Sequence, residues 1–231
     1  MFKFFRNIRQ SLLMENKTSK YFKYAIGEII LVVIGILIAL QINNWNENRK
    51  QYLAEIEFLK GIKNDLIQDS IYIDLIIRTI EPKLNAFNSL NKRISNYTEG
   101  NDIGKDSLFH TYLFVGQRTF YPVSGSFQSA IAGNAINTFE HKDITGLIIK
   151  LYNSIYPRLI DNASILDQRW DLLTQQYLEE RRTKQIVITT QDKAKKVIND
   201  MYYHYLQLNW YHEVLENTKE HISITLQKID D

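Results

Sequence analysis

The sequence contains no cysteine, only three prolines and only nine glycines among its 231 residues. The lack of cysteine excludes a disulfide framework, thiolate metal sites, iron–sulfur clusters and cysteine catalysis. The shortage of glycine and proline excludes collagen-like and Gly/Pro-rich disordered chains. Because 45% of the residues are hydrophobic and 12% are aromatic, the chain can form a folded core.

The chain also lacks a strong overall charge. Its 28 basic and 26 acidic residues leave a net charge of +2, so composition indicates neither a nucleic-acid partner nor an acidic substrate. The charge is unevenly spread, however. The first 24 residues hold one acid, Glu15, and six bases: Lys3, Arg6, Arg9, Lys17, Lys20 and Lys23.

A long apolar run follows this basic segment. Residues 25–42 read AIGEIILVVIGILIALQI, and residues 29–40 contain no polar side chain. A helix of about 18–20 residues, rising about 1.5 Å each, nearly covers a hydrocarbon core of roughly 30 Å. Aromatic side chains suited to the headgroup level flank the run: Tyr21, Phe22 and Tyr24 before it and Trp45 after it. The run predicts a transmembrane helix rather than a buried core helix, because it is apolar on every face.

The flanks of the run predict how it is inserted. Residues 41–50, QINNWNENRK, offer no small-residue cleavage site, which favours an uncleaved signal anchor over a removed signal peptide. Five basic residues in the twenty before the run, against three in the twenty after it, favour a cytoplasmic N-terminus. We expect a single-pass protein of the inner (cytoplasmic) membrane, with a basic cytoplasmic segment over 1–22, an anchor over 23–43 and a periplasmic domain over 44–231.

The cytoplasmic segment has a pattern of its own. Residues 2–13, FKFFRNIRQSLL, place apolar side chains on one helical stripe and basic ones on the other side. This pattern suits a helix lying in the anionic cytoplasmic leaflet. The alternative is a basic tail that only sets the topology.

Three positions inside the anchor are candidates for a specific role. Glu28 is an acid within the span, which makes it a functional candidate by default. It lies one turn from Lys23 and Tyr24, so a position at headgroup depth is favoured over a proton relay. Gly35 and Ala39 form a small-xxx-small pair that would let two anchors pack as a homodimer.

The N-terminal fifty residues resemble the start of a family of uncharacterised membrane proteins of Bacteroidota, typified by flavobacteria. The family's K-Y-x-x-Y-A-I-G-E motif is matched from Lys20 to Glu28, and its Q-I-N-N-W-N-E motif from Gln41 to Glu47. A weaker similarity covers Phe127 to Leu151, where Ala132, Gly133 and Asn134 stand at a small-residue turn. The resemblance implies a membrane location and a helical body. It supplies no activity and no catalytic residue, because the family is a domain of unknown function.

The body of the chain carries helical stripes of apolar residues spaced three and four apart. Ten of thirteen such positions from Tyr52 to Ile94 are apolar, as are nine of eleven from Ala194 to Ile229. A third stripe runs from Leu159 to Tyr177, and a shorter helix is expected over 141–155. Because each stripe must bury one face against partners, we predict an all-α fold, an antiparallel bundle of about four long, coiled-coil-like helices outside the membrane.

Interruptions between the stripes predict the connections. Pro82 is expected to bend or break its helix near Ile80. Residues 97–106 and 119–126 are expected to be loops. Residues 184–190, KQIVITT, have strand-like composition but no evident pairing partner, so we expect a connector there.

Groups able to carry chemistry are scattered rather than arranged in a known motif. His212, Glu216 and Glu220 share one helical face and are weak candidates for a metal site. The sequence has no H-E-x-x-H, no G-x-S-x-G and no phosphate-binding loop. Arg181 is expected only to complement a helix dipole, and Tyr205 to pack inside, while Tyr202, Tyr203 and Tyr211 are expected to be more exposed.

Two functions follow from these patterns. The first is a membrane-anchored, non-enzymatic helical module that binds a protein partner or senses a ligand in the cell envelope, without a cofactor and without nucleic acid. The alternative is an anchored metal-dependent enzyme that uses His204, His212, Glu216 and Glu220 of the C-terminal helix. The partners expected for the first are the lipid bilayer, a second copy of the chain or another envelope protein.

Overall fold

The protein is described by a computed structural model, which covers residues 18–94, 97, 100 and 102–231. The described residues form helices, turns and extended connections, with no strand among them. The chain divides into two compact units, Met1–Ala54 (unit 1) and Glu55–Asp231 (unit 2). The predicted amphipathic segment, residues 2–13, lies outside the described residues.

Helix α2, Thr18–Ile94, contributes to both units. In unit 1 it contains the apolar run, and none of the residues of its most apolar window is buried. By length and composition this helix is able to cross a membrane. The prediction of one long apolar helix near the N-terminus is confirmed.

Pro82 does not interrupt α2, so of the predicted bend or break near Ile80 the break does not occur. The helix continues through Pro82 to Ile94. A proline inside a helix removes one backbone hydrogen bond, but here the residues on either side are anchored in the core: Ile80 is 2% exposed and Phe87 is 2% exposed. Tertiary packing therefore outweighs the local cost of the proline.

Unit 2 contains two further long helices, α6, Tyr156–Gln176, and α8, Gln191–Asp230. Helix α6 is the last part of a run that starts with α5, Lys142–Lys150, and passes through the π-helical turn η4, Leu151–Ile155. The shorter elements of the unit are η1 (Ile103–Lys105), α3 (Ser107–Phe109), the π-helical turn η2 (His110–Phe114), α4 (Gly125–Ala132), η3 (Ala135–Asn137) and α7 (Leu178–Thr183).

Helix α8 runs antiparallel to the unit 2 part of α2, in a seven-residue register. The Lys219 ammonium lies 2.5 Å from an Asp74 carboxylate oxygen. Seven residues further along α2 and seven back along α8, His212 faces Glu81 at 3.9 Å. A further seven residues along, the Tyr205 hydroxyl donates to Asn88 at 2.9 Å. Steps of seven on both helices match the heptad period that the sequence pattern indicated.

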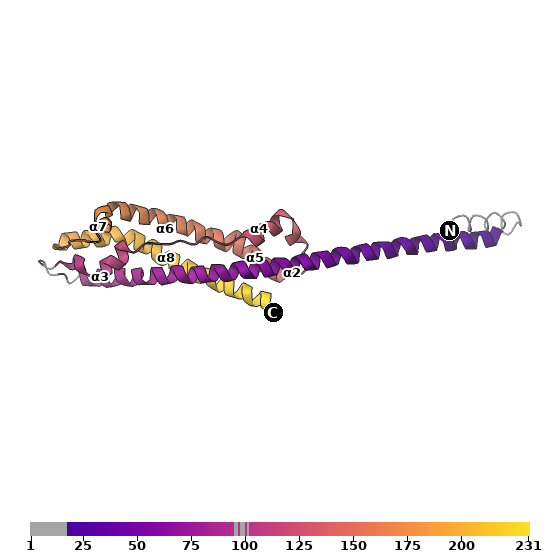
Figure 1. Ribbon diagram of the computed structural model, residues 1–231, viewed down its shortest axis with the longest axis horizontal. Helices are drawn as coiled ribbons and strands as arrows, with labels where there is room; N and C mark the ends of the chain where they lie inside the picture. Colours follow the sequence, from indigo (N-terminus) through magenta and orange to yellow (C-terminus); the bar gives the residue numbers. More distant parts are fainter. Residues whose placement is uncertain (1–17, 95–96, 98–99, 101) are drawn as a thin grey trace. The chain divides into compact units, whose positions relative to one another are not determined.

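Helix α6 runs in the same direction as α2 and opposite to α8. The Tyr156 hydroxyl at the start of α6 donates to Asp69 at 2.6 Å, and Trp170, fourteen residues later, lies over Lys83, fourteen residues further along α2. Helices α6 and α8 lie side by side (Figure 1), and Gln207 of α8 contacts Asn162 of α6.

The predicted antiparallel bundle of about four long helices is therefore not confirmed. Of the three long helices among the described residues, α2 and α6 point the same way. The chain returns between them through an extended segment, residues 115–124, rather than through a long helix (Figure 1). This segment is fixed by side chains of the helices it passes. Phe120 donates its backbone N–H to the Tyr211 hydroxyl at 2.9 Å, and Thr119 donates its hydroxyl to Asp167 at 3.0 Å.

The apolar stripes bury most of the predicted positions, except at the start of the first stripe. Leu66 and Ile73 of α2 are fully buried, as are Leu208 and Leu215 of α8. Tyr52 and Ile56, at the start of the first predicted stripe, are 50% and 42% exposed, which contradicts their assignment to the core.

Tyr211 is fully buried, so the prediction that it is more exposed is wrong. Its hydroxyl accepts the Phe120 N–H. Tyr202 and Tyr203 are exposed as expected, and Tyr205 is partly buried and stacks on Phe87 with 4.0 Å between the ring centroids.

Three buried carboxylates of α2 hold the segment from Val123 to His141, which includes α4. Asp69 accepts the Val123 N–H at 2.9 Å, and Asp65 accepts the Ser126 N–H at 3.2 Å. Glu55 accepts the backbone N–H groups of Glu140 and His141, at 3.0 and 2.9 Å. Each charged acceptor satisfies N–H groups that a turn leaves without backbone partners.

Their surroundings shift the pKa values of two of these acids in opposite directions. Burial by itself would raise the pKa of Glu55, but hydrogen bonds from Glu140 and His141 outweigh it, so the pKa lies below its usual value. For Asp69 burial dominates. It raises the pKa to about 6 despite the hydrogen bonds from Tyr156 and Val123, and the neighbouring Asp65 raises it further.

Candidate functional site

The predicted anchor positions all lie on α2 in unit 1. Trp45 is 64% exposed, and Ala39 is also exposed. Nothing lies within 4 Å of the place where a Cβ would sit on Gly35. Glu28 is partly exposed. Unit 1 thus presents an apolar helical surface with these four positions on it.

The candidate metal ligands of α8 do not come together. Glu216 and Glu220 are exposed, and the nearest acid to His212 is Glu81 of α2, with Nε2 and Oε1 separated by 3.9 Å. Among the described residues, no three His, Cys, Asp or Glu side chains are grouped to hold a metal ion. His204, the fourth residue of that hypothesis, is buried in a different environment described below.

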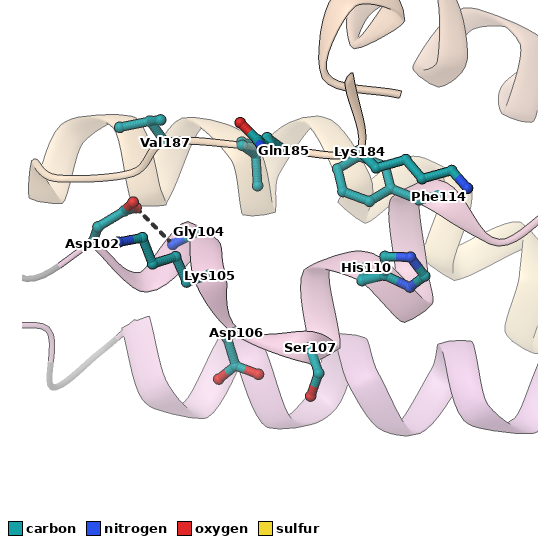
Figure 2. A pocket seen from close by; sticks show the side chains of 11 residues that line it. Asp102, Gly104, Lys105, Asp106, Ser107, His110, Phe114, Lys184, Gln185 and Val187 are labelled. Carbon is teal, nitrogen blue, oxygen red and sulfur yellow. Dashed lines mark hydrogen bonds between the residues drawn. The ribbon is translucent and has the colours of Figure 1, made fainter. Parts of the chain in front are cut away.

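Unit 2 contains a pocket of about 490 Å³ between η1, η2 and the connector that follows α7. We call it the η2 pocket. Figure 2 shows the side chains that line it, contributed by η1 and η2 on one side and by residues 184–187 on the other. The lining includes three basic side chains, those of Lys105, His110 and Lys184, and the apolar side chains of Phe114 and Ile186.

The connector that forms one wall pairs with the loop before η1. Ile103 donates its N–H to the Ile188 carbonyl at 3.1 Å, and Asp102 accepts the N–H groups of Ile188 and Gly104, at 2.8 and 3.0 Å. Residues 184–190 thus act as a connector, as predicted, and form no strand. Their backbone partners come from a loop, which the strand-like composition did not indicate.

Gly104 is required by this pairing. A Cβ on residue 104 would sit 1.9 Å from the Ile186 carbonyl oxygen. No side chain fits at that distance, so only glycine lets η1 approach the connector this closely. The result is a pocket with two walls in direct backbone contact.

The other wall, η2, is held from the protein interior by two cations. Lys83 of α2 donates to the Val115 carbonyl at 2.8 Å and lies 3.4 Å from the Tyr112 carbonyl. Arg181 of α7 donates to the Leu113 carbonyl. Carbonyls at a helix C-terminus carry partial negative charge and attract cations, so both residues stabilise the end of η2.

Both cations lie over the ring of Trp170 of α6. The Lys83 ammonium is 3.8 Å from the centroid of the Trp170 ring, and the Arg181 guanidinium carbon is 4.8 Å from it. Cation–π attraction of this kind strengthens when the cation is shielded from water. Burial, together with the positive charge of Arg181, lowers the pKa of Lys83 to about 7.

A buried histidine connects η2 to α8. His204 is 1% exposed, its Nδ1 lies 2.9 Å from the Tyr112 hydroxyl, and its Nε2 lies 2.7 Å from Gln117 Oε1. Because Gln117 Oε1 only accepts, Nε2 carries the proton and Nδ1 is left as an acceptor for the tyrosine. Burial lowers the pKa of His204 to about 3, with Lys83 and Arg169 adding to the effect. His204 is thus a neutral core residue.

Lys83 was not singled out from the sequence. Arg181 lies in the last turn of its helix, as expected, but its contacts with Leu113 and Trp170 were not predicted. Lys83 falls three and four residues from Ile80 and Phe87, which is the spacing of the buried stripe. A charged residue in such a stripe indicates that its side chain has a polar partner inside the protein. Arg181 carries no comparable signal, because its partners, Leu113 and Trp170, are distant in sequence.

The chain was compared with protein families, with curated proteins and with solved structures. The sequence model of DUF6090, a family of unknown function, matches residues 28–222. No curated protein and no solved structure matches the chain.

Proposed function

The chain belongs to the DUF6090 family, and on that premise we propose that it is a membrane-anchored, non-enzymatic helical module of the cell envelope that senses a ligand or binds a protein partner. In this proposal residues 23–43 are an uncleaved signal anchor in the inner membrane. Residues 1–22 are cytoplasmic, and residues 44–231 are periplasmic.

The observation that best supports a membrane anchor is the environment of the apolar run. None of the residues in its most apolar window is buried, whereas unit 2 has a packed core of its own. An apolar surface of this length is unfavourable in water, and a bilayer would cover it. The five-to-three excess of basic residues before the run supports a cytoplasmic N-terminus.

The proposal that unit 2 binds rather than catalyses is supported by what its buried titratable groups contact. Lys83 donates to a carbonyl of the chain, and His204 is bonded to Tyr112 and Gln117. Asp69 and Glu55 accept backbone N–H groups of the chain. A general acid, base or nucleophile has to reach a substrate, and these groups are directed at the protein's own backbone and side chains.

The matching seven-residue steps on α2 and α8 support a coiled-coil pairing of these helices within the module. A long, regular helix pair of this kind can transmit a change at a binding site along its length. We propose that the pairing is the stable frame on which the η2 pocket is built.

Extraction of membranes with alkaline carbonate tests the anchor. The full-length chain is expected to stay in the membrane pellet. The double variant Ile36→Lys/Leu37→Lys is expected to be released, because each charge near the centre of a span costs about 2.5–3.5 kcal/mol. Leu172→Lys is the matched control in unit 2, where Leu172 is 69% exposed, and it should remain in the pellet. Release of the unmodified chain would disprove the anchor.

Labelling with a membrane-impermeant maleimide tests the orientation. The chain has no cysteine, so single cysteines report one position each. Leu178→Cys, at a site 67% exposed, should be labelled in intact spheroplasts, and Ser11→Cys only after lysis. The reverse pattern would contradict a cytoplasmic N-terminus.

A second copy of the chain is the partner that the anchor sequence supports. Gly35 and Ala39 would let two anchor helices approach closely. Replacing both by leucine should lower the yield of dimers crosslinked in the membrane. An unchanged yield would remove this pair from the proposal.

A further inference from the structure

We propose that the η2 pocket binds a small organic anion, a carboxylate or phosphate joined to an apolar group. The inference rests on the proposed function in one respect, which is that this anion is the ligand that the module senses. The binding chemistry itself follows from the residues around the pocket, and it can be tested independently of the membrane anchor.

The basic side chains of the pocket are available to a ligand. Lys105, Lys184 and His110 are exposed. Neither lysine side chain forms an ion pair or a hydrogen bond with any residue that the structure describes, and the ring of His110 makes an edge-on contact with Phe114. Two ammonium groups without partners beside one pocket attract an anion.

The acidic side chains at the pocket are already engaged. Asp102 accepts two backbone N–H groups, those of Gly104 and Ile188. Asp106 accepts the Leu108 N–H through one oxygen and pairs with the Arg93 guanidinium through the other. Because protein donors stabilise these negative charges, the groups left to interact with a ligand are the positive ones.

The position of the aromatic ring suggests how the ligand would lie. Figure 2 shows the Lys184 side chain beside Phe114, with His110 at the same end of the pocket, while Lys105 lies toward the other end. Ile186 and Val187 add apolar surface to the connector wall. An anionic group at the Lys184 end would therefore be next to a surface on which an apolar group can pack.

The pocket walls are held in place before any ligand arrives. Lys83 and Arg181 hold the carbonyls at the end of η2, and the close approach of Gly104 to Ile186 joins η1 to the connector. A preformed site loses less conformational entropy on binding than a mobile one. The volume of about 490 Å³ suits a small organic molecule rather than a bare ion or a folded partner.

Fluorine NMR of fluorinated probes with the full-length protein in lipid nanodiscs tests the proposal. The probes are 4-fluorophenyl phosphate, 4-fluorobenzoate and the neutral 4-fluorobenzyl alcohol, each compared with empty nanodiscs. One or both anions should show protein-dependent line broadening that weakens as salt is raised, and the neutral probe should show none. The two anionic probes distinguish a phosphate ligand from a carboxylate ligand.

Variants locate the binding. Lys105→Gln/Lys184→Gln should weaken binding of the broadened anion by about tenfold or more, as the loss of a charge-assisted contact worth roughly 1.4 kcal/mol predicts. Lys195→Gln removes an exposed lysine of α8 away from the pocket residues and should leave binding unchanged. A melting curve for each variant shows whether it is folded.

Two results would overturn the inference. One is the absence of broadening for both anions with the unmodified chain. The other is equal affinity in the folded double variant and in the Lys195→Gln control. Either result leaves the membrane anchor intact, because the anchor is tested by extraction, and failure of the anchor would in turn leave a measured anion affinity standing.

Discussion

The ammonium of Lys83 lies 3.8 Å from the centroid of the Trp170 ring, inside the core of unit 2. Lys83 is 1% exposed, so this contact replaces water around a cation. The lysine also donates to the Val115 carbonyl. One side chain of α2 thereby contacts α6 and the segment that follows η2, and it connects the helical core to the wall of the η2 pocket.

Replacing Lys83 by methionine should change how stability depends on pH. Burial lowers the pKa of Lys83 to about 7, so between pH 7 and pH 9 the folded lysine is largely neutral while the unfolded one is still charged. The unfolded state then binds more protons, and the free energy of unfolding rises with pH. Relative to that of Lys83→Met, the free energy of unfolding of the unmodified chain should rise by roughly 1 kcal/mol per pH unit over this interval. Urea unfolding of both proteins in mild detergent, at several pH values, measures this difference. If the two free energies of unfolding depend on pH in the same way, the prediction is wrong.

Asp69→Asn should reveal the opposite trend. Burial raises the pKa of Asp69 to about 6, so between pH 6 and pH 4 the folded state binds more protons than the unfolded state. The free energy of unfolding therefore rises as pH falls through this interval. Compared with that of Asp69→Asn, the free energy of unfolding of the unmodified chain should rise by roughly 2 kcal/mol on going from pH 7 to pH 4.

Thermal melts at several pH values, followed by circular dichroism, measure this difference. Asp161→Asn is the matched control, because Asp161 is an exposed acid of α6. Its pH dependence should follow that of the unmodified chain. A loss of relative stability at low pH would refute the role given to Asp69.

Two glycine substitutions should have effects of opposite sign. Gly104→Ala would place a Cβ 1.9 Å from the Ile186 carbonyl oxygen, and overpacking of this kind costs about 1–3 kcal/mol. Gly146→Ala, in α5, meets nothing within 4 Å and should stabilise the helix by up to about 1 kcal/mol. Chemical unfolding of both variants checks the prediction, which fails if Gly104→Ala is neutral.

Crosslinking should report the register of α2 against α8. The double variant Asp74→Cys/Lys219→Cys places thiols where an ion pair of 2.5 Å now lies. A short bis-maleimide should join them within one chain, which a tryptic digest detects. Asp74→Cys/His212→Cys is one heptad out of register and is the control. Equal crosslinking of both pairs would rule out the seven-residue pairing.

Local patterns were informative where the chemistry is local. The apolar run from Ala25 to Ile42 predicted one long apolar helix. This prediction needs only neighbouring residues, because the run is apolar on every face of the helix. The stripe that includes Leu66 and Ile73 predicted a buried face for the same reason. At Tyr52 and Ile56 the stripe continues but both side chains are exposed, so the pattern alone placed the start of the core too early.

The helix packing and the pocket depend on contacts between distant residues. The extended segment 115–124 allows α2 and α6 to run in the same direction, and its hydrogen bonds come from residues such as Tyr211 and Asp69. The η2 pocket is lined by both Lys105 and Lys184, which are far apart along the chain. No local spacing predicts such pairs.

The sequence by itself determined that the chain is helical, that its N-terminal helix is apolar enough to span a membrane, and which faces of most helices are buried. These properties follow from side-chain periodicity, which depends only on neighbouring residues. The tertiary structure alone decided which partners surround Lys83 and His204, that Gly104 joins two walls, and that two lysine side chains without partners border one pocket. Charge and burial at these positions depend on which distant segments pack together, and that information is not carried by any short stretch of sequence.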